Sequence, residues 1–197
     1  MTAIVPGKRL FKEDFSHLVL LSAAYFPALF GARAGRALAG LYVRERNLFS
    51  YRHTLFALRE NTVAGMLLAY DCAVKRKENL RTGALLFAQC GLQMLKRLPV
   101  LLQLDKTIGS LPSGACYISN IATYENYRGQ GIASRLIAAC EERGRQQQAT
   151  QMVLDVEQDN LTAISLYKYL GYTAAAEFRI ALGPSYLAFV RMGKSLA

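Results

Sequence analysis

Tyr127-Arg128-Gly129-Gln130-Gly131-Ile132-Ala133 is the stretch of sequence from which the fold can be predicted. Its two glycines let the backbone turn tightly and approach a ligand, and a helical pattern begins at Ile132. A helix start has unpaired backbone N–H groups and the positive end of the helix dipole, which together favour a phosphate. The stretch therefore predicts an anion site, although Gly-x-Gly before a helix also fits a plain turn between strand and helix.

Regular elements are predicted on both sides of this loop. Apolar runs and helical spacing predict strands at 115–123, 152–156, 176–180 and 186–192, and helices at 132–147 and 161–170, the latter ended by Gly171. In the first half the patterns predict helices at 15–30, 33–44 and 80–98, and a hairpin from 53–58 and 62–70, where the sheet is expected to start. The charged run 75–78 is interpreted as a solvated turn, and Pro99 is expected to interrupt the helix before it. These elements predict an α+β protein with a mixed sheet.

Two segments beside the loop complete a known pattern. Asn120-Ile121-Ala122-Thr123 precedes it, and Asn160-Leu161-Thr162-Ala163-Ile164-Ser165-Leu166-Tyr167-Lys168-Tyr169-Leu170-Gly171-Tyr172 follows it. Together with the loop they resemble the GNAT superfamily of N-acetyltransferases, whose loop reads Arg/Gln-x-x-Gly-x-Gly/Ala and whose later helix reads Asn-x-x-Ala-x-x-Leu-Tyr-x-x-x-Gly-Phe/Tyr. The resemblance is close over about 117–172 and is greatest to the ribosomal-protein N-terminal acetyltransferase branch.

This resemblance implies a fold and a co-substrate. The fold would be a mixed, mostly antiparallel central sheet flanked by helices, in a single acetyltransferase domain over 1–197, with 80–104 as a helical insertion before the fourth strand. The co-substrate would be acetyl-coenzyme A, with backbone groups of 121–123 on its pantetheine arm and N–H groups of 128–134 around its pyrophosphate. The residues implied to contact it are Ile121, Ala122, Thr123, Arg128, Gly129, Gln130, Gly131, Ile132, Ala133, Ser134, Asn160 and Tyr167.

Two residues are candidates for catalysis. The resemblance implies that Tyr167, on the same helix face as Asn160, gives a proton to the departing thiolate; a core tyrosine is the alternative. Many relatives carry a carboxylate on the strand before the loop, but no Asp or Glu lies between 113 and 123. Glu157 is therefore the first candidate for the base, directly or through water, ahead of Glu125 and Asp155.

Composition restricts the remaining choices. Hydrophobic residues make up 52% of the 197 residues and charged residues 19%, which excludes a disordered chain. The four cysteines and two histidines show no metal-ligand spacing, so no metal is expected and the cysteines are interpreted as reduced core residues. No secretory leader opens the chain, and the apolar stretches 18–30 and 83–104 are interrupted by proline or charge. We therefore expect no transmembrane segment and a cytoplasmic protein.

The predicted function is N-acetyl transfer from acetyl-coenzyme A to a primary amine of a peptide, protein or small molecule, by direct attack of the amine. A catalytically silent acyl-coenzyme A binding or sensor protein is the alternative. The net charge of +10 attracts polyanions, but aromatic residues are not interleaved with the basic ones, which disfavours nucleic acid. The insertion 80–104 is expected to be a wall or lid of the acceptor site, or else part of the core or of a homodimer contact. Tyr124 and Tyr186 are further candidates for shaping the acceptor site.

Overall fold

The computed structural model describes residues 2–182 and 185–196, apart from the side chains of 92, 93, 108, 109, 182 and 185. These residues form a seven-stranded sheet in the order β1-β2-β3-β4-β5-β7-β6. The strands are β1 (Thr2–Pro6), β2 (Thr54–Arg59), β3 (Thr62–Asp71), β4 (Ala115–Thr123), β5 (Gln151–Glu157), β6 (Thr173–Leu182) and β7 (Ser185–Ser195). β4 and β5 pair in parallel and all other neighbours are antiparallel, so the expected mixed, mostly antiparallel sheet is confirmed.

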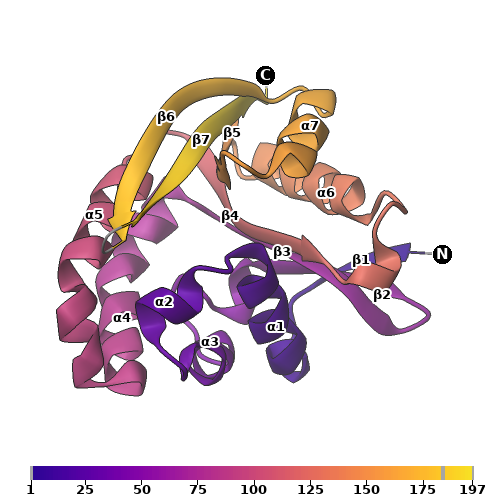
Figure 1. Ribbon diagram of the computed structural model, residues 1–197. Coiled ribbons are helices and arrows are strands. Elements are labelled where there is room, and N and C mark those ends of the chain that lie inside the picture. Colours follow the sequence, from indigo (N-terminus) through magenta and orange to yellow (C-terminus); the bar gives the residue numbers. More distant parts are fainter. Residues whose placement is uncertain (1, 183–184, 197) are drawn as a thin grey trace.

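Helices cover both faces of this sheet (Figure 1). The helices are α1 (Lys12–Ser22), α2 (Phe26–Phe30), α3 (Ala34–Tyr42), α4 (Cys72–Cys90), α5 (Leu98–Gly109), α6 (Ile132–Gln146) and α7 (Leu161–Tyr169). Short 3-10 turns are η1 (Arg9–Phe11), η2 (Tyr51–His53), η3 (Leu92–Arg97) and η4 (Glu125–Tyr127). α6 and α7 bury apolar side chains against one face, α1 and α3 cover the other, and α2 to α5 form a third apolar cluster with each other.

The first half of the chain differs from the sequence predictions in three places. The sheet does not start at the hairpin, because β1 pairs with β2 along its whole length. The expected helix 15–30 is two helices, since the chain turns at residues 23–25 between α1 and α2. The run 75–78 is not a turn: the Asp71 side chain accepts a 2.6 Å hydrogen bond from the N–H of Val74 and so caps α4, which contains that run.

The insertion before β4 is also longer than expected. Helices occupy nearly all of 72–109 rather than 80–104 alone. α4 ends at Cys90, and the next residue, Gly91, has a φ of 76° with a ψ of −168°, a combination that suits glycine. Pro99 lies in the first turn of α5, a position where its missing N–H has no helical partner to lose. None of the described helices has the length and apolar content to cross a membrane.

β4 and β5 separate partway along their length. Their parallel pairing ends at Ile118 and Leu154. Ser119 is an extra residue in β4, because Leu68 of β3 pairs with Asn120 while Ala69 pairs with Ile118. Such a bulge bends its strand, so β4 continues along β3 to Thr123 while β5 continues along β7 to Glu157. The result is an opening between two strands in the middle of the sheet.

Candidate active site

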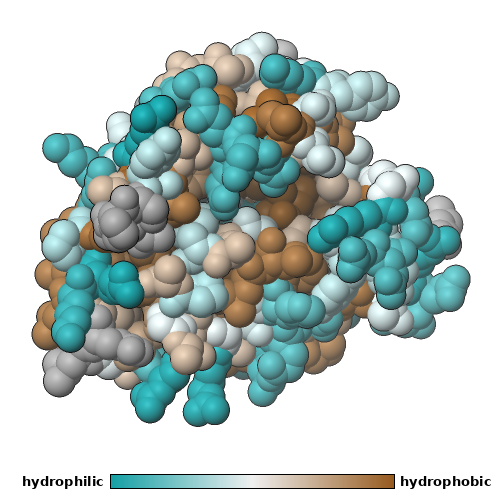
Figure 2. Space-filling view, viewed as in Figure 1, coloured by the Kyte–Doolittle hydropathy of each residue, from teal (hydrophilic) through white to brown (hydrophobic). Residues whose placement is uncertain are grey.

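A cavity of about 590 Å³ fills the opening between β4 and β5. Residues 118–123 of β4 and 154–157 of β5 form its two walls, and α1, α7 and β7 contribute further side chains. On the face shown in Figure 2, hydrophobic surface lines the hollow between the side that carries α6 and α7 and the side that carries α1. The backbone edges that line such an opening have no neighbouring strand and can pair with an extended ligand.

The glycine loop lies at one end of this cavity. Gly129 and Gly131 have φ values of 72° and 71°, and a Cβ added at either would meet no atom within 4 Å. Gly131 precedes α6 and no side chain caps that helix, so its first N–H groups have no side-chain acceptor among the described residues. Arg128 and Ala133 line the cavity itself. The loop therefore offers space, amide donors and a positive charge for a phosphate group.

The β4 wall consists of the strand's end beyond Ile118, where β4 no longer pairs with β5. The Thr123 hydroxyl is buried and makes no hydrogen bond to any described residue. The residue lines the cavity, but its hydroxyl oxygen lies beside Gly65 of β3, 3.2 Å from the position of a Cβ added there. Ile121 and Ala122 lie beside Thr123 along the same wall. The backbone edge of β4 beyond Ile118, which does not pair with β5, and the open loop together fit an elongated, phosphorylated ligand such as acetyl-coenzyme A.

α7 contributes Asn160 and Tyr167 to the opposite side. The Asn160 side-chain oxygen accepts a 3.1 Å hydrogen bond from the N–H of Ala163, which makes it the N-cap and leaves its amide NH₂ available. Tyr167 is only 6% exposed, lines the cavity, and has its pKa raised to about 12 by burial. Its phenol therefore keeps its proton at neutral pH.

The three candidate bases differ in their surroundings. Glu157 lines the cavity, and burial followed by the charge of Asp159 raises its pKa above the usual range. Asp155 is held by Arg191, whose Nε and Nη2 donate to its two carboxylate oxygens at 2.8 and 2.9 Å. Glu125 is exposed in η4 and does not line the cavity. Glu157 is the one of these three carboxylates that is both in the cavity and uncommitted to an ion pair.

The remaining expected contacts are spread around the loop. Gly129, Gln130 and Gly131 are exposed, Ile132 buries its side chain in the core beneath α6, and Ser134 is half-buried. Because the side chain of Ile132 is buried, this residue could contact a ligand only through its backbone groups. Among the described residues, no three or more His, Cys, Asp or Glu side chains gather as metal ligands would.

Tyr25 is a site residue that the sequence patterns did not predict. It lies in the turn between α1 and α2, packs its ring edge-on against Phe189 of β7 at 5.8 Å, and lines the cavity. Burial raises its pKa strongly, and the nearby charge of Glu157 adds to that effect. The aromatic cluster Tyr25-Phe26 before Pro27 was the only signal, and the expectation of a continuous helix at 15–30 concealed it.

The two tyrosines expected to shape the acceptor site lie outside this cavity. Tyr124 donates a 2.8 Å hydrogen bond to Asp14 of α1. Tyr186 is 59% exposed on β7, with the guanidinium of Arg179 stacked 4.7 Å from its ring centre.

Residues 20–172 match the model of the Acetyltransferase (GNAT) family. This match covers most of the chain, so the protein belongs to the GNAT acetyltransferase family.

Individual relatives match either a short part of the chain or the whole chain at low sequence identity. N-alpha-acetyltransferase 30 of Schizosaccharomyces pombe is 41% identical over 56 residues, which are 28% of this chain and 37% of that relative. The structure resembles a crystal structure of an N-acetyltransferase from Staphylococcus aureus Mu50, with a TM-score of 0.76 and 19% identity over 98% of this chain and 100% of that one. It also resembles the ribosomal-protein-S18-alanine N-acetyltransferase of Escherichia coli, with a TM-score of 0.62 and 14% identity over 100% and 95% of the two chains. These structural likenesses concern the fold.

Proposed function

We propose that this protein transfers an acetyl group from acetyl-coenzyme A to a primary amine by direct attack, in one acetyltransferase domain over 1–197. The observation that carries the proposal is a single cavity that joins the uncapped start of α6, the backbone edge of β4 beyond Ile118, and the side chains of Glu157 and Tyr167. These groups match, in the same order, the phosphate groups, the amide-containing arm and the reacting thioester of acetyl-coenzyme A.

Acetyl-coenzyme A supplies a thioester: the C–N bond to the amine forms as the C–S bond breaks, which yields the N-acetyl amine and coenzyme A. Glu157 takes the proton that the amine nitrogen loses, directly or through a water molecule. The Tyr167 hydroxyl donates a proton to the sulfur atom of coenzyme A as it leaves. N–H groups of 128–134 and the edge of 121–123 hold the reactants in position, which by itself supplies much of the rate.

Thermal melting with acetyl-coenzyme A tests the proposal. A ligand at 100 times its Kd adds about 2.7 kcal/mol of stability. For a chain of this size we expect the melting temperature to rise by about 5–10 °C. Gly131→Asp should abolish the rise, because it places bulk and negative charge where a phosphate would bind.

Gly91→Asp is the matched control, since Gly91 has a φ of 76° and also has no atom within 4 Å of an added Cβ. Its ψ of −168° suits Asp less well than the left-handed ψ of 12° at Gly131, so it should lower the melting temperature by at least as much but leave the rise with ligand intact. An unchanged melting temperature in the wild type would overturn the proposal. If acetyl-coenzyme A raises the melting temperature but no amine leads to release of coenzyme A, the result would favour a catalytically silent binding protein.

We also propose a reducing, cytoplasmic compartment. Cys72, Cys116 and Cys140 carry thiols rather than disulfides, which is usual for proteins kept under reducing conditions.

A further inference from the structure

A second cavity of about 690 Å³ adjoins the active-site cavity. Side chains of α2, α4, η3 and α5 form its walls, and most of them are leucine or phenylalanine. The two cavities share Tyr25, Ser119 and Asn120, so the second one begins beside the opening between β4 and β5. Its volume lies in the range of about 300–1,000 Å³ that is typical of sites for organic ligands.

The charged groups of this second cavity are already paired. Asp105 is the one acid among its described lining residues, and its Oδ1 accepts hydrogen bonds from Lys75 Nζ at 3.0 Å and Asn79 Nδ2 at 2.9 Å. Lys75 is almost buried, with 10% of its side chain exposed. A cationic group entering from solvent would therefore find no free carboxylate here. The walls favour an uncharged, apolar occupant.

The junction between the two cavities is polar. The Asn120 amide donates to Ser22 Oγ at 2.9 Å, and the Ser119 hydroxyl donates to the Asn120 side-chain oxygen at 3.0 Å. Tyr25 borders both cavities, and burial, followed by the nearby charge of Glu157, raises its pKa above the usual range. A molecule with an apolar body and one polar end would match this change of surroundings.

We propose that the acceptor is a primary amine attached to a large uncharged apolar body, either an aryl or long alkyl group of a free amine or the first side chain of a peptide. The proposal rests on the acetyl transfer proposed above. The body occupies the cavity between α2, α4 and α5, and the amino group lies at the Tyr25 and Asn120 junction, on the side of Glu157. Polyamines and other polycations are excluded as preferred acceptors, because the cavity has no uncompensated acid and the chain carries a net charge of +10.

A series of acceptors tests the proposal directly. With acetyl-coenzyme A saturating, kcat/KM is measured for ethylamine, hexylamine, 2-phenylethylamine and spermidine, and for peptides that begin with Leu, Gly or Asp. We expect kcat/KM to rise at least 10-fold from ethylamine to the best apolar amine, or from the Gly peptide to the Leu peptide, since each methylene in an apolar pocket changes selectivity by about 10-fold or more. The arm that shows the rise identifies free amines or peptides as the source. A preference for spermidine, or equal values across both series, would overturn the proposal.

Polar substitutions at the exposed rim of the cavity provide a second test. Leu98→Gln and Leu102→Gln change leucines that line the cavity but are 47% and 60% exposed, so the fold should persist. Each should lower the ratio of kcat/KM for the apolar amine to that for ethylamine by about 5- to 10-fold, with the Kd for acetyl-coenzyme A unchanged. Leu10→Gln is the control, because Leu10 is 72% exposed on η1.

A substitution that fills the cavity avoids any loss of stability. Gly83 lies in α4, lines the cavity, and has no atom within 4 Å of an added Cβ. Gly83→Ala, Gly83→Leu and Gly83→Phe should all strengthen the helix while they progressively lower kcat/KM for the largest apolar amine. No dependence on side-chain size would contradict the proposal.

The results separate this inference from the proposed function. Acetyl-coenzyme A binding and acetylation of small amines without any apolar preference would reject the inference alone. No binding of acetyl-coenzyme A would reject both. A dimer that becomes monomeric in Leu98→Gln and Leu102→Gln, with unchanged acceptor ratios, would overturn the inference and show that the cavity is a contact between two copies of the chain.

Discussion

Tyr167 can be tested as the proton donor by removing only its hydroxyl. In Tyr167→Phe the ring stays in its buried place beside Tyr172, where the ring centres lie 6.0 Å apart. We expect kcat to fall about 100-fold, the lower end of the range for a positioned acid because a thiolate is a good leaving group. The Kd for acetyl-coenzyme A should remain the same.

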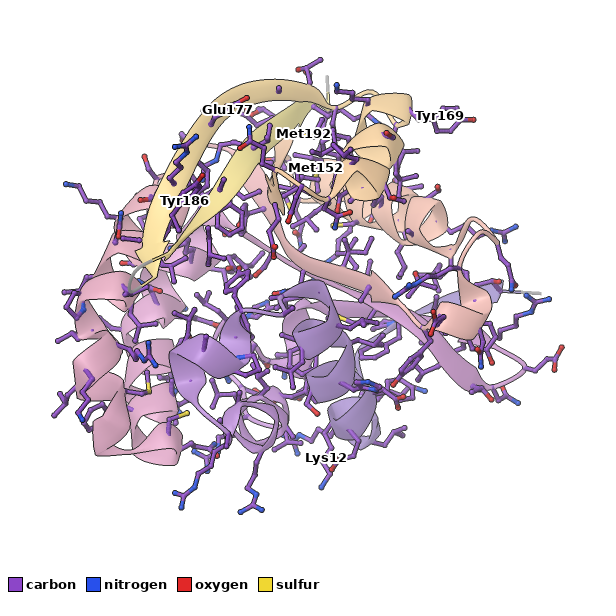
Figure 3. The ribbon with its side chains drawn as sticks, viewed as in Figure 1. Lys12, Met152, Tyr169, Glu177, Tyr186 and Met192 are labelled. Atoms are coloured by element: carbon purple, nitrogen blue, oxygen red, sulfur yellow. The ribbon has the colours of Figure 1, made fainter. Side chains whose placement is uncertain are left out.

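Tyr169→Phe is the matched control for this change. Tyr169 is on the same helix but is 85% exposed and points away from the molecule (Figure 3). Its loss of a hydroxyl should leave kcat within about twofold of the wild type. An unimpaired kcat in Tyr167→Phe from about pH 6 to about pH 9 would show that Tyr167 is a core tyrosine only.

Glu157 is tested by the pH dependence of the rate. A base must be unprotonated, so kcat/KM should fall as the pH falls through the pKa of Glu157. Because burial raises that pKa, the fall should be centred above the ordinary glutamate value of 4.5. Glu157→Gln should lower kcat/KM by about 100-fold and remove this acidic limb.

Glu177→Gln is the corresponding control, since Glu177 is exposed on β6 (Figure 3). It should keep both the rate and the acidic limb. An acidic limb that persists in Glu157→Gln would assign the proton transfer to another group.

The start of α7 combines a structural role with a proposed binding role in Asn160. Asn160→Ala removes the cap and should lower the free energy of unfolding by about 1 kcal/mol, measured by urea denaturation. Asn160→Asp retains a capping oxygen but loses the amide donor, so it should preserve stability while it weakens acetyl-coenzyme A binding. Equal affinity for the ligand in Asn160→Asp and the wild type would leave Asn160 with the capping role alone.

The insertion of α4, η3 and α5 is attached to the sheet by Arg191 of β7. Arg191 pairs with Asp155 of β5 and also donates to the backbone oxygens of Ser110 at 2.8 Å and Thr107 at 3.2 Å, at the end of α5. Tyr117 of β4 donates to the same carboxylate at 3.1 Å. The ion pair of Arg191 and Asp155 thus connects two strands of the sheet with the helices that carry the second cavity.

Removing this arginine should destabilise the whole molecule. Arg191→Met leaves the carboxylate of Asp155 buried without its partner, so we expect a loss of about 3–5 kcal/mol in urea denaturation. The double variant with Asp155→Leu should recover much of that loss. Arg179→Met, on exposed β6, should change stability by less than about 1 kcal/mol. A loss that small in Arg191→Met would mean that the pair is dispensable.

Local sequence was sufficient for the elements of the second half. Gly129 and Gly131 directly precede α6, and Asn160 and Gly171 enclose α7. Because these signals lie next to the elements that they begin or end, short-range patterns predicted the elements correctly. The hairpin of β2 and β3 was predicted as well, because its two-residue turn at Glu60 and Asn61 is flanked by apolar runs. The loop and α7 also carry the residue pattern typical of the GNAT family, and both lie within the matched residues 20–172.

Other features depend on contacts between distant parts of the chain. β1 is a strand because it pairs with the edge of β2, about 50 residues away in sequence. The opening between β4 and β5 depends on a bulge at Ser119, which no local sequence pattern predicts. Likewise, Asp155 and Glu157 look equivalent in sequence, two residues apart on one face of β5, yet Arg191 occupies the first while burial and the charge of Asp159 act on the second. Sequence by itself determined the family, the glycine loop and most elements, because their signals are local. Tertiary structure decided which carboxylate is free, where Tyr25 lies and what the insertion encloses, because burial and pairing arise only when distant segments pack together.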